Sequence, residues 1–149
     1  MIPSAKALIT TLVLGITAFL AEPNGPLGAF WAPHPGVSQA TGAQIPLFFI
    51  LGLVEALAFG LGVSFLIFGY PLVKAIRPAS EAMTRAAHLS IAWLLINWWP
   101  HDSLHIHNGL ELNGLLAIEY GFHITLIIAG LILVYFFLTL LPQESAGSR

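Results

Sequence analysis

The stretch that decides how this chain is organised is residues 97–123, which read NWWPHDSLHIHNGLELNGLLAIEYGFH. Four of the six histidines lie in it, together with three of the seven acidic residues. Almost everything else in the chain is apolar. Because the sequence avoids charge nearly everywhere and gathers imidazoles and carboxylates here, we expect this stretch to carry the functional groups.

The composition predicts an integral membrane protein. Of the 149 residues, 57% are hydrophobic and only 8% are charged. A soluble domain carries roughly 25% charged residues, so this chain has too few to cover a water-facing surface. The length suits one membrane domain, 1–149, and no basic patch indicates nucleic acid. Cysteine is absent, which excludes disulfides, thiolate metal sites and iron–sulfur clusters.

Apolar segments predict an all-α bundle of four transmembrane helices, at approximately 5–21, 45–70, 82–99 and 110–141. The first segment has the length of a signal-peptide core, but Phe19 would stand at the −3 position of a cleavage site after Ala21. A small residue is needed there, so we favour an uncleaved helix.

Two extracytoplasmic loops are predicted, at 22–44 and 100–109. The first contains four prolines and four glycines, which exclude a regular helix. The second follows Trp98 and Trp99, a pair that is typical of a membrane–water boundary. In the first loop, His34 is either an exposed loop histidine or a fifth histidine folded back onto the cluster.

All the positive charges fall on one side of this arrangement. They are Lys6 before the first span, Lys74, Arg77 and Arg85 between the second and third, and Arg149 after the fourth. Neither predicted loop contains Lys or Arg. Since Lys and Arg favour the cytoplasmic side, both termini are predicted to be cytoplasmic and the histidine cluster extracytoplasmic. In a bacterium the membrane would be the inner, cytoplasmic one.

Small residues recur at four-residue spacing in two of the predicted spans. Such spacing lets helices approach closely in lipid. The predicted packing positions are Gly52, Ala56, Gly60, Ala117 and Gly121.

The outer polar cluster consists of His101, Asp102, His105 and His107. If the segment is helical, His101 and His105 face one ion, and if it is extended, His105 and His107 do. Imidazole and carboxylate ligands suit copper, zinc or iron, so we predict a divalent transition metal here. The alternatives are a solvated polar cap and a histidine pH switch.

A second, buried polar layer is predicted from Glu55, His88, Glu119 and His123, which fall at similar depths. An acid within the bilayer costs about 2.5–3.5 kcal/mol, so the two glutamates need partners. Glu119 and His123 loosely resemble the Glu-x-x-His spacing of di-iron bundles, which makes them further metal candidates. A haem between His88 and His123 fits the axial ligand types. Structural hydrogen bonding and proton transfer are the alternatives.

The function that these features favour is that of a metal-binding membrane protein, redox or hydrolytic. One alternative is a non-catalytic subunit of a larger membrane complex, or a homo-oligomer, with the small-residue faces used for docking. Another is a proton or metal-ion pathway. The chain has no nucleophile elbow, P-loop or dinucleotide-binding glycine motif, so no catalytic residue is assigned.

Overall fold

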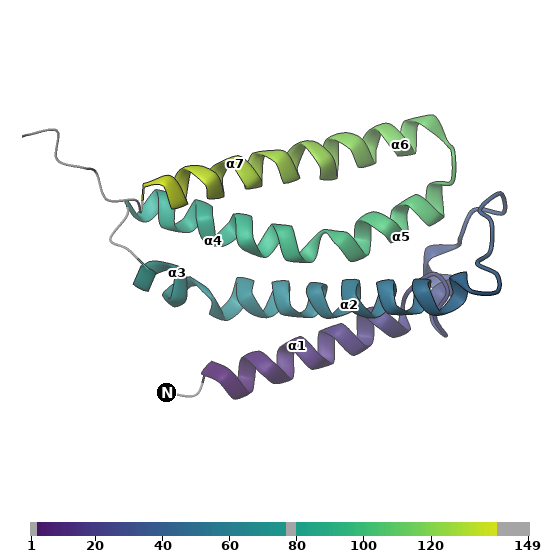
Figure 1. The fold of residues 1–149 in the computed structure, drawn as a ribbon, viewed down its shortest axis with the longest axis horizontal. Coiled ribbons are helices and arrows are strands. Elements are labelled where there is room, and N and C mark those ends of the chain that lie inside the picture. The colour runs from purple at the N-terminus through teal and green to yellow at the C-terminus, as the bar shows by residue number, and fades with distance from the viewer. Residues whose placement is uncertain (1–2, 77–79, 140–149) are drawn as a thin grey trace, which may run out of the picture.

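The chain folds into helices that run up and down beside one another in chain order (Figure 1). The computed structural model describes residues 3–76 and 80–139, and no strand occurs within these ranges. The helices are α1 (Pro3–Leu20), α2 (Gln44–Phe68), α3 (Tyr70–Ile76), α4 (Glu81–Ile96), α5 (Trp98–Asn108), α6 (Leu112–Ile118) and α7 (Thr125–Leu138). A short 3₁₀ turn, η1 (Gly28–Trp31), lies between α1 and α2, and a π-helical segment, η2 (Glu119–Ile124), joins α6 to α7. α1 packs against α2, α2 against α4 and α5, and α4 against α7.

Two helices are long and apolar enough to cross a membrane. They are Gln44–Phe68, with 25 residues, and Leu112–Leu138, with 27. Only 33% and 11% of their most apolar windows are buried inside the protein, so most of their apolar surface faces outward. A hydrocarbon environment would cover this surface favourably, which agrees with the composition. The four-span count and the orientation stay predictions.

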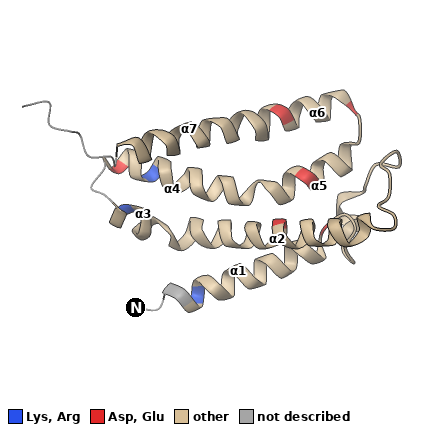
Figure 2. Cartoon of the chain, in the orientation of Figure 1, with Lys and Arg blue, Asp and Glu red and all other residues tan. Residues whose placement is uncertain are grey.

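The basic residues that the structure describes gather at one end of the bundle (Figure 2). Lys6 lies near the start of α1, Lys74 in α3 and Arg85 near the start of α4. The other two, Arg77 and Arg149, lie outside the described residues. The described part of the charge pattern is therefore compatible with the predicted orientation.

α1 and α2 approach each other closely through small residues. Gly60 is buried, and a Cβ there would overlap the carbonyl oxygen of Thr11 and come within 2.7 Å of the backbone nitrogen of Gly15. A Cβ on Gly15 would in turn come within 3.3 Å of the carbonyl oxygen of Ala56. One turn beyond Gly60, the Ser64 hydroxyl donates a hydrogen bond of 2.9 Å back to α1. The predicted small face of α2 thus lies at a helix–helix contact.

The second small face is not covered by another helix within the described residues, so its predicted role in packing stays a prediction. Ala117 and Gly121 are exposed, and a Cβ on Gly121 would meet nothing within 4 Å. The π-helical segment explains the difference, because its wider turn takes up an extra residue and shifts the faces on either side of it. Ala129, two turns later, is buried again.

The predicted loop at 100–109 is wrong, since most of it is helix α5. Pro100 lies in the first turn of α5, where its missing N–H needs no partner. The buried Asn97 stands between α4 and α5, and its amide donates a 2.6 Å hydrogen bond to the carbonyl of Trp93. The actual turn is at 109–111, where Gly109 has a φ of 57° and Glu111 caps α6 by accepting from the N–H of Asn113.

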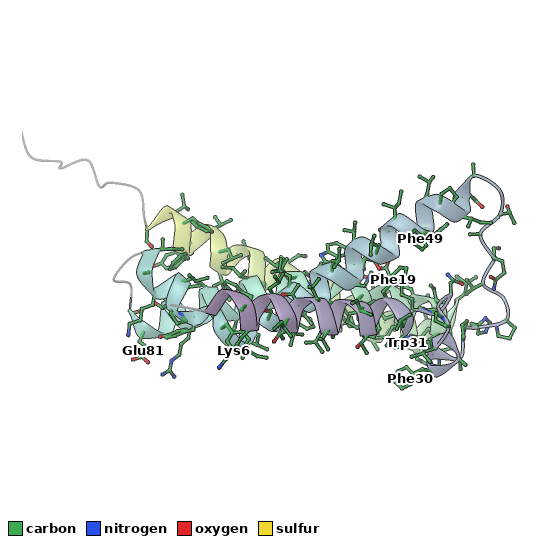
Figure 3. The ribbon with its side chains drawn as sticks, turned by 90° about the horizontal axis from the view of Figure 1, so that it is seen from below. Lys6, Phe19, Phe30, Trp31, Phe49 and Glu81 are labelled. Carbon is green, nitrogen blue, oxygen red and sulfur yellow. The ribbon has the colours of Figure 1, made fainter. Side chains whose placement is uncertain are left out.

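The Pro-rich segment 22–44 folds back against α5. Trp31, at the end of the molecule remote from Lys6 (Figure 3), meets the ring of Trp99 edge-on with centroids 5.4 Å apart. The backbone N–H of His34 donates to the carbonyl of Ile106 at 2.9 Å. This segment therefore covers one side of the helix that carries most of the histidine cluster.

The glycine contacts predict opposite effects of one substitution at two positions. Gly60→Ala should lower the free energy of unfolding of the detergent-solubilised protein, measured by thermal or chemical denaturation, by about 1–3 kcal/mol. The reason is that the added methyl group overpacks the α1–α2 contact. Gly121→Ala should be neutral or stabilising by up to about 1 kcal/mol, since the site is open and helical. Equal losses from the two substitutions would contradict this packing.

Candidate functional site

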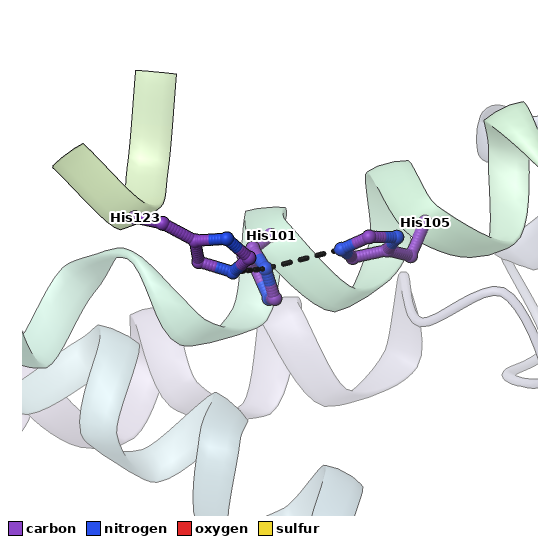
Figure 4. A group of neighbouring side chains, drawn as sticks. All are labelled: His101, His105 and His123. Atoms are coloured by element: carbon purple, nitrogen blue, oxygen red, sulfur yellow. Dashed lines mark hydrogen bonds between the residues drawn. The ribbon is translucent and has the colours of Figure 1, made fainter. Parts of the chain in front are cut away.

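Three imidazoles converge where α5 meets η2 (Figure 4). His101 and His105 come from α5, and His123 comes from η2. The Nε2 atom of His101 lies 2.9 Å from Nε2 of His123 and 3.2 Å from Nε2 of His105. One nitrogen from each ring lies within 4.8 Å of the other two, which makes the three a group that could hold a metal ion.

The antiparallel arrangement of α5 and η2 explains why residues 22 positions apart meet. Side chains on a helix lean toward its N-terminus. His101 therefore leans toward Trp98 at the start of α5, and His123 leans toward Glu119 at the start of η2. His105 follows His101 by one helical turn and leans back onto it.

The π-helical segment is fastened to α4 just beyond His123. The indole N–H of Trp93 donates to the hydroxyl of Thr125 at 2.9 Å, and its ring stacks on Phe122 with centroids 5.7 Å apart. Thr125 also bonds back to the carbonyl of Gly121 at 2.7 Å. These contacts fix the depth and rotation at which η2 presents His123.

Two carboxylates are hydrogen-bonded to the Nδ1 atoms of two of the rings, on the side away from the Nε2 atoms. Asp102 Oδ1 lies 2.7 Å from Nδ1 of His101, and Glu119 Oε2 lies 2.6 Å from Nδ1 of His123. An ionised carboxylate can only accept, so each Nδ1 carries the proton and donates it. In the neutral rings the Nε2 atoms then hold lone pairs.

This tautomer assignment places lone pairs against each other. With both Nδ1 atoms donating, Nε2 of His101 and Nε2 of His123 face one another at 2.9 Å with no hydrogen between them. The contact is repulsive unless a positive charge, either a metal ion or an additional proton, lies between the rings. Carboxylates that bond the outer nitrogen of metal-bound histidines are a common feature of metal centres.

The surroundings of His105 favour its neutral form. Burial, followed by the electrostatic effect of the neighbouring His101, lowers the pKa of His105 below its ordinary value. Since only a neutral imidazole can ligate a metal, this shift favours His105 as a ligand.

Two other histidines of the predicted cluster lie elsewhere. His107 turns its Nδ1 to the carbonyl oxygens of Trp31 and Ala32, so the prediction of His107 as a ligand is not supported by the geometry. His34 folds back toward α5, but its Nδ1 accepts from the N–H of Gly36 at 3.0 Å. Asp102 and Glu119, also predicted as ligands, contact the histidines rather than the point where the Nε2 atoms meet.

The predicted buried layer is divided among separate places. His88 is buried in the middle of α4, where its Nε2 donates to the carbonyl of Phe65 at 3.0 Å. It precedes Trp93 by five residues, which is about 7 Å along the helix and away from His123. The geometry therefore does not support a haem between His88 and His123. Glu119 and His123 pair with each other at the half-exposed edge of the bundle rather than in its core.

Glu55 lies instead in an acidic pocket with a residue that the sequence argument missed. Glu22, Glu55 and Asp102 line a pocket of about 70 Å³, which also contains Trp99 and Ser103. Burial raises the pKa of the Glu22 carboxyl to about 7, and its Oε1 finds no hydrogen-bond partner among the described residues. The sequence does contain a signal for this residue, because Glu22 is the first acid after an apolar helix of 18 residues.

No family model, no curated protein and no solved structure matches this chain.

The raised pKa of Glu22 predicts a pH-dependent loss of stability. The carboxyl titrates near 4.5 when unfolded and near 7 when folded, so its contribution to stability is full below pH 4.5 and is lost as the pH rises through 7. Glu22→Gln removes the ionisation, so the melting temperature of the variant should fall less than that of the wild type between these pH values. If the melting temperatures of the two proteins change with pH by the same amount across this range, the raised pKa of the buried carboxyl is contradicted.

Proposed function

We propose that this chain is an integral membrane protein that binds one divalent transition-metal ion through the Nε2 atoms of His101, His105 and His123. The observation that carries this proposal is the convergence of three ring nitrogens, two of which, Nε2 of His101 and Nε2 of His123, face one another with their lone pairs. Asp102 and Glu119 fix the two rings that they bond, so the donor atoms are oriented before any ion arrives.

The spacing of the donors suits a transition metal. Imidazole nitrogens bound to zinc lie at about 2.0–2.1 Å from the ion, so two of them in a tetrahedron are about 3.3 Å apart. The two short separations here, 2.9 and 3.2 Å, are within a few tenths of an ångström of that value. Nitrogen donors favour zinc, copper or nickel over calcium and magnesium, which prefer oxygen.

The membrane part of the proposal is a four-span arrangement with both termini in the cytoplasm. Its support is the apolar outer surface of α2 and of 112–138, and the gathering of Lys6, Lys74 and Arg85 at one end. The metal site then lies in the extracytoplasmic half, between the first two turns of α5 and the η2 segment that follows α6.

Metal content tests the site directly. Wild-type protein purified in detergent and equilibrated with Zn²⁺ at neutral pH should retain about one ion per chain after desalting. His123→Ala and His105→Ala should each lower the affinity at least tenfold, because each removes one of three ligands. Metal content by mass spectrometry and affinity by isothermal titration provide the two measurements.

His107→Ala is the matched control, because it removes a histidine from the same helix that does not face the group. It should bind as the wild type does. Loss of binding in His107→Ala, or wild-type affinity in His123→Ala, would overturn the assignment of ligands. Wild-type protein that binds no metal would leave an additional shared proton as the charge between the rings.

The orientation has its own test. A reporter that is active only in the cytoplasm, fused after residue 149, should be active, whereas a reporter that is active only outside the cytoplasm should be silent there. The reverse result would place the histidines on the cytoplasmic side.

A further inference from the structure

The described part of the chain supplies only three donors to the proposed metal. The carboxylates nearest to it, those of Asp102 and Glu119, are hydrogen-bonded to ligand rings at 2.7 and 2.6 Å on the side away from the Nε2 atoms. His107 is turned toward the carbonyls of Trp31 and Ala32. Among residues 3–76 and 80–139, the only group of histidines and acids that could hold a metal is formed by these three histidines.

Three protein ligands distinguish two kinds of metal site. Zinc sites that serve only the fold are closed by four protein ligands, whereas sites with three protein ligands hold water or an exogenous molecule in the remaining position. The three-histidine group belongs to the second kind by its donor count.

The group is also open on one side. His101 is 9% exposed, but the side chain of His123 is 40% exposed and that of Glu119 is 55% exposed. The accessible side is therefore the edge between α5 and η2, and the buried side is the one behind His101.

We propose that the metal bound by His101, His105 and His123 keeps one coordination position for an exogenous small anion or water, which enters between α5 and η2. This inference rests on the proposed metal site and adds to it a ligand-binding position. The ligand class follows from the charge: three neutral imidazoles cancel none of the ion's positive charge at the metal itself, so the remaining position attracts a compact oxygen or nitrogen donor.

Cobalt substitution tests the open position with a readout that needs no activity. The full-length protein in detergent is loaded with Co²⁺, whose visible absorption bands depend on the number and type of its ligands. Azide is then added as the probe anion. We expect a saturable change of these bands that follows a titration curve for one azide per cobalt, in the wild type and equally in His107→Ala.

The possible results distinguish a failure of the open coordination position from a failure of the proposed metal site. If one Co²⁺ binds per chain and azide leaves the spectrum unchanged, the position is closed and the inference is wrong while the metal site stands. If no Co²⁺ is bound, both fail. A change of the bands that persists in His123→Ala at unaltered cobalt content would place the responding metal elsewhere and would overturn the inference as well.

Discussion

The hydrogen bonds that His101 donates to Asp102 and that His123 donates to Glu119 determine which ring nitrogens are free to bind a metal. Each carboxylate is acceptor-only when ionised, so each draws the ring proton to Nδ1 and leaves Nε2 as a donor of electrons. The two Nε2 atoms then face each other at 2.9 Å, with a third 3.2 Å away. Without these bonds either ring could rotate or change tautomer, and the three histidines would be an ordinary polar cluster. With them, the group requires a positive charge at its centre.

The helices place this group where an apolar protein can hold it. Trp93 of α4 donates a hydrogen bond to Thr125, the residue directly after η2, and so holds η2 against α4. The helix is interrupted at Asn97, and α5 continues from there beside η2. Charged groups inside a bilayer are unfavourable unless they pair with one another. Asp102 and Glu119 meet this requirement by accepting hydrogen bonds from histidines. Glu22 and Glu55 line one pocket with Asp102, where burial favours the neutral carboxyl of Glu22.

The sequence predicted the helical class, the apolar surface, the loop at 22–44 and the stretch that holds the site. It did not predict α5, because Pro100 after two tryptophans reads as a helix end, whereas a proline in the first turn is equally compatible with a helix beginning. That error separated His123 from His101 and His105, since a loop at 100–109 would put His123 at a different depth. The exposure of Gly121 could not be predicted from the sequence either, because a four-residue spacing of small residues does not reveal a π-helical turn.

The measurement that tests the central claim most directly is nitrogen-15 NMR of the histidine rings in the detergent-solubilised protein, before and after Zn²⁺ is added. The account predicts that His101 and His123 carry their proton on Nδ1, and that their Nε2 signals, together with that of His105, shift when zinc binds. Assignment by the corresponding His→Ala variants identifies each signal. Protons on Nε2 of His101 and His123, or Nε2 signals that do not respond to zinc, would contradict the account.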